Sequence, residues 1–82
     1  MAMNIASATK QIDDMIEHIE VLRFTDSKEA LKVALHALEL SKEINYPQAE
    51  AILLLKIGSV YSNISEYAKG IEYIIAAIPF SE

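Results

Sequence analysis

Apolar residues recur at helical spacing in four segments of the chain, and short breaks separate the segments. The segments are residues 4–24, 27–43, 47–63 and 66–78. In the first, Ile12, Ile16 and Ile19 share one side and acidic residues occupy the other, which is typical of an amphipathic helix. We predict an all-α fold of four antiparallel helices, arranged as two stacked helical hairpins in a single domain.

The second and third segments carry the pattern of helices with several neighbours. In the second, Ala34 and Ala37 belong to a stripe of small residues, while Val33 and Leu40 belong to another stripe. Two stripes predict contacts on two sides. The third segment begins at Pro47, a residue favoured at the first helical position. It is apolar nearly all round, so we expect it to be the central helix.

The fourth segment is expected to begin after Ser65, as a capping residue, and to end at Pro79. Its apolar residues exceed what one preceding helix can cover. We predict a self-association face there, which comprises Tyr67, Tyr73, Ile75 and Phe80. The alternative is that the first and third helices together cover this surface.

Composition and charge remove several classes of function. The chain has 82 residues, no cysteine and a net charge of −5. The missing cysteines exclude disulfides and thiolate zinc sites. The acidic balance disfavours nucleic-acid binding, which needs clustered Lys and Arg. No secretory signal or bilayer-spanning run is present, so we expect a cytoplasmic protein without membrane contact.

Two segments of the chain resemble one another. Residues 30–38 match residues 70–78 at a shift of 40, so that Leu31 corresponds to Ile71 and Leu38 to Ile78. The second and fourth helices therefore play the same role twice. A repeat of helix pairs is the signature of an α-solenoid.

The third and fourth segments carry spaced motifs. Leu54 is followed by Ile57-Gly58 and then Tyr61, and Gly70 is followed by Ile74. Over residues 51–78 the chain thereby resembles the tetratricopeptide repeat family, whose first helix has a large residue, then Leu-Gly, then Tyr, and whose second helix has a small residue, usually Ala, and then Phe. The shift of 40 exceeds the usual repeat of about 34 residues. A repeat of this greater length is similar to the longer repeats of bacterial signalling proteins.

The resemblance implies a non-catalytic protein–protein interaction module, the regulatory or sensory segment of a larger signalling protein. Ligands of the family often lie in a groove formed by the first helices of each pair. The residues that could face such a groove are Gln48, Lys56, Ser59 and Asn63. We prefer to interpret these four residues as ordinary surface residues. Fewer than three repeats seldom suffice for stability, so a fragment or a homodimer is expected.

Candidate chemistry is sparse. Asp14 and His18 are four residues apart and could share a helix face that holds a metal or serves phosphotransfer. A solvated acidic face is the simpler interpretation. No nucleophile elbow or glycine-rich phosphate loop is present. We therefore expect no enzyme, no catalytic residue, no metal and no cofactor.

Overall fold

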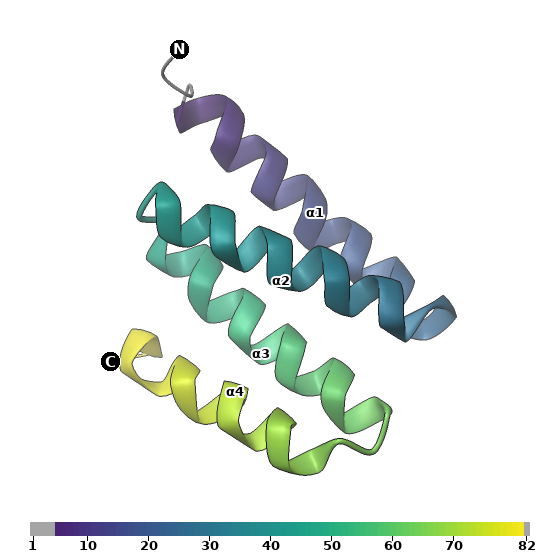
Figure 1. The fold of residues 1–82 in the computed structure, drawn as a ribbon. Coiled ribbons are helices and arrows are strands. Elements are labelled where there is room, and N and C mark those ends of the chain that lie inside the picture. The colour runs from purple at the N-terminus through teal and green to yellow at the C-terminus, as the bar shows by residue number, and fades with distance from the viewer. Residues whose placement is uncertain (1–4, 82) are drawn as a thin grey trace.

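The structure, a computed structural model, describes residues 5–81, and the side chains of residues 6–79. The described residues form four helices: α1 (Ile5–Thr25), α2 (Ser27–Glu43), α3 (Pro47–Asn63) and α4 (Tyr67–Ser81). Each runs antiparallel to the one before it (Figure 1). The predicted all-α fold of four antiparallel helices is confirmed.

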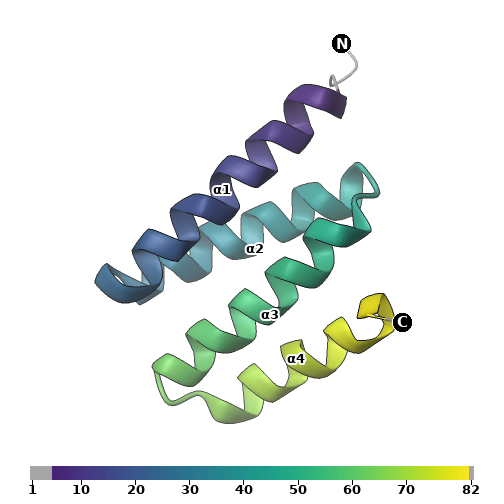
Figure 2. The same cartoon turned by 180° about the vertical axis from the view of Figure 1, so that it is seen from behind.

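The helices lie side by side in chain order, which gives a flat molecule with α1 and α4 at opposite edges (Figures 1 and 2). Its Cα atoms extend over 41 × 30 × 17 Å. Among the described elements, α3 packs against α1, α2 and α4, whereas α4 packs against α3 alone. The third helix is therefore central, as its all-round apolar pattern predicted.

Small residues line the sides of α2 that face its neighbours. Ala30, Ala34, Ala37 and Ser41 are fully buried. The Ser41 hydroxyl donates a hydrogen bond of 2.8 Å to the Leu38 carbonyl, so its burial leaves no polar atom unsatisfied. Because α2 contacts both α1 and α3, the prediction of neighbours on two sides is confirmed.

The backbones of α3 and α4 touch where two glycines meet. A Cβ atom on Gly58 would lie 2.9 Å from the Gly70 carbonyl oxygen and 2.7 Å from Cγ1 of Ile74. A Cβ atom on Gly70 would lie 2.8 Å from the Gly58 carbonyl oxygen. All three distances are shorter than van der Waals contact. Gly70 is therefore required by packing, although alanine would favour the helix more.

The α2–α3 and α3–α4 connections have the same hydrogen bonds. The Tyr46 amide donates to the Ser41 carbonyl, and the Asn45 amide to that of Lys42. Twenty residues later, the Glu66 amide donates to the Tyr61 carbonyl and the Ser65 amide to the Ser62 carbonyl in the same pattern. This is the Schellman arrangement, whose central residue adopts the left-handed conformation. Asn45 and Ser65 accordingly have φ of 57° and 66°.

The α1–α2 connection is tighter and has no left-handed residue. Asp26 alone separates the helices, and its side chain accepts a 3.2 Å hydrogen bond from the Glu29 amide. Its own amide donates to the Leu22 carbonyl, which extends α1 by one residue beyond the predicted end. The Asp26 side chain thus caps the start of α2.

The bounds of α4 differ from those predicted. The helix begins at Tyr67 and continues through Pro79 to Ser81. Ser65 lies in the turn as the left-handed residue, so it does not cap the helix. Pro79 falls in the last turn, where the missing amide removes a single helical hydrogen bond, and the residues after it can still bond to preceding carbonyls.

Replacing Ser65 by glycine should stabilise the protein. Ser65 is exposed, and its positive φ carries a steric cost that glycine does not have. We expect Ser65→Gly to raise stability by about 1 kcal/mol, or roughly 4–8 °C in melting temperature. Circular dichroism at rising temperature measures this change. Asn45→Gly should give a smaller gain, because asparagine tolerates the left-handed region; equal gains would contradict the explanation.

Candidate functional site

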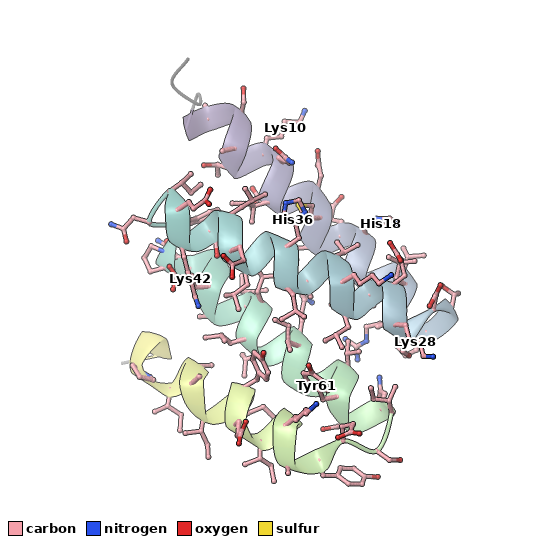
Figure 3. All side chains as sticks on the ribbon, viewed as in Figure 1. Lys10, His18, Lys28, His36, Lys42 and Tyr61 are labelled. Carbon is pink, nitrogen blue, oxygen red and sulfur yellow. The ribbon has the colours of Figure 1, made fainter. Side chains whose placement is uncertain are left out.

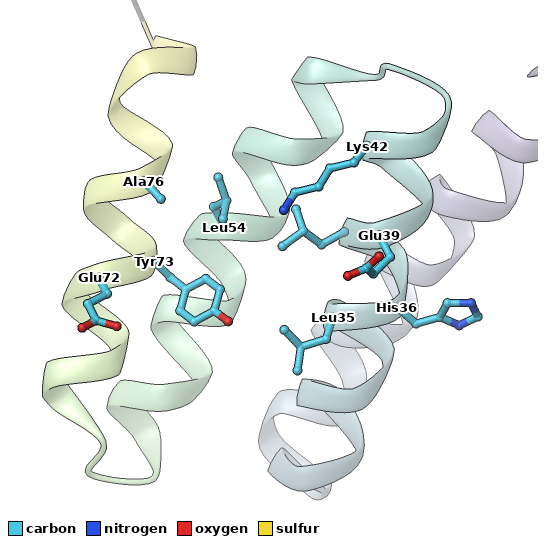
Figure 4. A pocket seen from close by; sticks show the side chains of 9 residues that line it. Leu35, His36, Glu39, Lys42, Leu54, Glu72, Tyr73 and Ala76 are labelled. Carbon is cyan, nitrogen blue, oxygen red and sulfur yellow. The ribbon is translucent and has the colours of Figure 1, made fainter.

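A groove lies between α2 and α4, which both pack against α3 but do not contact one another among the described elements. Its volume is about 620 Å³, and we call it the valley (Figure 4). The residues that line it are Leu35, His36, Leu38, Glu39, Lys42, Leu54, Glu72, Tyr73 and Ala76. It is thus a surface formed by three helices, with α3 as its floor.

The floor of the valley is apolar. Leu38 and Leu54 are 6% and 7% exposed, and Leu35 and Tyr73 are half-buried beside them. The Tyr73 ring stacks on Tyr61 of α3, with 5.5 Å between centroids and 25° between planes. This stacking holds the Tyr73 ring toward α3 rather than toward solvent. A fixed aromatic wall is typical of sites that bind apolar groups.

Charged side chains stand along the rim of the valley. Glu39 and Lys42 come from α2 and Glu72 from α4, and all three are exposed. Burial raises the pKa of the Tyr73 hydroxyl above its usual value, and Tyr61 and Glu72 raise it further. The hydroxyl is therefore neutral at pH 7, where it can donate or accept a hydrogen bond.

The predicted groove residues lie elsewhere on α3. None of Gln48, Lys56, Ser59 and Asn63 lines the valley. Ser59 is five residues from Leu54, which places it about 140° around the helix from the valley floor. Gln48 and Asn63 are exposed and Ser59 is half-buried. These four residues are not brought together with the valley residues.

Lys56 serves as a bridge between helices. Its Nζ pairs with Oε1 of Glu20 on α1, and only 19% of the Lys56 side chain is exposed. Arg23 Nη1 approaches the other Glu20 oxygen at 3.4 Å. Burial lowers the pKa of Lys56 below its usual value. The ammonium is thus engaged in holding α3 to α1, and it is not free to meet a ligand.

The residues predicted for self-association separate onto two sides of α4. Tyr67 and Ile75 are 62% and 57% exposed on its outer side. Tyr73 is half-buried and points into the valley (Figure 4). The Phe80 side chain lies outside the described residues. The first and third helices do not share in covering α4, because α1 makes no contact with it among the described elements.

Asp14 and His18 are exposed on α1 at the edge of the molecule, where Figure 3 marks Lys10 and His18. They line a shallow hollow together with Ser7, Lys10, Gln11 and Met15. In the part of the chain that the structure describes, no three His, Asp or Glu side chains gather as a metal site requires.

Several valley residues went unrecognised in the sequence. Leu35, Glu39 and Lys42 follow one another at spacings of four and three residues on α2, so they share one side of it. That spacing was the available signal. Ala76 carried none, because a single alanine is compatible with any surface of a helix.

Comparison with known proteins supplies no relative: no family model, no curated protein and no solved structure matches the chain. Within residues 5–81, no helix combines the length and the apolar character needed to cross a bilayer.

Proposed function

We propose that the chain is a non-catalytic protein–protein interaction module of the tetratricopeptide type, and that its valley receives an amphipathic helix from a partner. The observation that carries the proposal is the valley itself. Its two walls, α2 and α4, are separated by α3, so the space between them can accept one further helix (Figure 4). Helix-in-groove binding uses apolar anchors spaced along one side of the incoming helix.

The packing of α3 against α4 supports the tetratricopeptide part of this proposal. The close crossing at Gly58 and Gly70 agrees with the small residues that the family pattern places there. The longer repeats that the chain resembles occur in bacterial signalling proteins, so a regulatory segment is the setting we propose for it.

Charge favours a basic partner. Glu39 and Glu72 stand on opposite walls of the valley and outnumber Lys42, the lysine of its rim, and the whole chain has a net charge of −5. A helix with Lys or Arg beside its apolar stripe would place cations near both carboxylates. Such complementarity raises the association rate and the specificity more than the affinity. The apolar anchors would contact Leu35, Leu54 and Tyr73.

The proposal can be tested with displayed peptides. A library of amphipathic 17-residue helices, the length of α2, would be selected on the immobilised protein. We expect enriched peptides with an apolar stripe and basic flanks. Ala76→Arg should weaken their binding at least about tenfold, because the long side chain would project into the valley. Isothermal titration calorimetry measures the dissociation constants.

Ala68→Arg is the matched control. Ala68 is exposed on the same helix and does not line the valley, and arginine is nearly as good a helix former as alanine. Both variants add one positive charge, so a purely electrostatic effect would weaken both equally. Equal losses, or a selection that enriches no peptide, would refute the proposed role of the valley.

A further inference from the structure

The outer side of α4 bears a continuous apolar stripe that no helix within residues 5–81 covers. Its members are Tyr67, Ile71, Ile74, Ile75 and Ile78, and we call them the α4 face. Each is between 41% and 62% exposed. Their spacing of four, three, one and three residues keeps them on one side of the helix. Two helices that pack together present this pattern to one another.

The chain exposes more surface than its size requires. Its accessible surface is 5321 Å², whereas a typical folded monomer of 9.1 kDa exposes about 4,900 Å². The five side chains of the α4 face expose on the order of 100 Å² each, or about 500 Å² per copy. Two such faces together hold at most about 1,000 Å² for burial, which is the lower limit for a specific interface.

The distribution of charge favours a second copy as the occupant. The α4 face holds no charged residue, so two identical faces can meet without burying a like-charged pair. The opposite edge of the molecule is different. The outer residues of α1 include Lys10, Gln11, Asp14, Glu17 and His18, all exposed. Head-to-tail stacking of α1 on the α4 face would bury these groups without partners.

We propose that two copies of this chain form a twofold-symmetric dimer by packing their α4 faces against each other in antiparallel orientation. A parallel pair would bring the two large Tyr67 rings together at one end. An antiparallel pair sets Tyr67 beside Ile78 of the second copy at both ends, so the two α4 helices stay evenly separated along the interface. Such a contact between identical surfaces is closed, so association stops at the dimer.

This dimer rests on a surface other than the valley. Ala76 and the valley residues lie off the α4 face, and the two proposals can fail separately. Peptide binding in the valley with a monomeric protein would overturn the dimer alone. A dimer without peptide binding would overturn the valley alone.

Absolute mass measured by light scattering across a dilution series is the first test. We expect a dimer that dissociates at micromolar concentration. Ile71→Lys should raise the dissociation constant at least about tenfold, since it sets a charge in the centre of the interface. Val21→Lys is the control, because Val21 is 63% exposed on α1. A monomer at every concentration, or equal effects of the two variants, would overturn the proposal.

Cysteine cross-linking then tests the orientation, and the absence of native cysteine makes it clean. In an antiparallel pair, residues 67 of the two copies lie about 16 Å apart along the helix axes, whereas residues 67 and 78 meet. We expect a 1:1 mixture of Tyr67→Cys and Ile78→Cys to form a disulfide-linked dimer under mild oxidation. Neither variant should do so by itself. Linkage of Tyr67→Cys alone would overturn the antiparallel arrangement.

Discussion

Leu53→Ala should remove a large part of the protein's free energy of unfolding. Leu53 is fully buried on α3, the helix that contacts all three others. Truncating a buried leucine costs about 2–5 kcal/mol, because apolar contacts are lost and a cavity remains. A domain of this length has a total stability of roughly 4–12 kcal/mol, so the loss consumes a large part of it. Urea unfolding followed by circular dichroism would show the change.

Leu55→Ala provides the matched control for that experiment. The substitution is the same, and Leu55 lies two residues farther along the same helix, but it is 49% exposed. We expect it to cost less than about 1 kcal/mol, because little packing is lost at an exposed position. If the two variants unfolded at the same urea concentration, α3 would not be the central helix of the fold.

Alanine at either glycine of the α3–α4 crossing should destabilise the protein, although alanine favours helices. At Gly58 two contacts of an added Cβ fall below 3 Å, one of them with backbone. Overpacking of this kind costs about 1–3 kcal/mol, and the higher helix propensity of alanine offsets about 1 kcal/mol of that cost. We place Gly58→Ala near the upper end and expect a net loss of about 2 kcal/mol. Urea titration measures it.

A double-mutant cycle makes this prediction specific. Once one added methyl group has separated the helices, the second methyl group meets more space. Gly58→Ala with Gly70→Ala should therefore cost less than the sum of the single changes by at least about 0.5 kcal/mol. The exposed Ala68→Gly should show the opposite preference, in which alanine is the more stable residue. Strict additivity would contradict a shared close contact.

The four helices could be predicted because each signal was local. The alanine stripe indicates α2, and the all-round apolar pattern with Pro47 at its start indicates α3. Each of these signals lies within the helix that it predicts. The end of α4 could not be predicted in this way. Whether a proline stops a helix or merely weakens its last turn depends on the residues after it and on the packing of that turn.

The valley could not be predicted because it depends on which helices fail to touch. Helical spacing places Tyr73 about 120° around α4 from Tyr67. That spacing does not reveal that the Tyr73 ring stacks on Tyr61 and so turns toward α3. Likewise, the approach of Glu20 to Lys56 joins residues of α1 and α3 that are far apart in the sequence. Both facts follow from the way α3 lies between its neighbours.

Chemical-shift mapping tests the central claim, that the valley is the partner-binding site. The selected amphipathic peptide would be titrated into ¹⁵N-labelled protein, and the amide shifts would be followed by NMR. The account predicts that the largest changes fall on Leu35, Leu54, Tyr73 and Ala76, which line the valley. Changes centred instead on the exposed side of α3, at Gln48, Ser59 and Asn63, would contradict it.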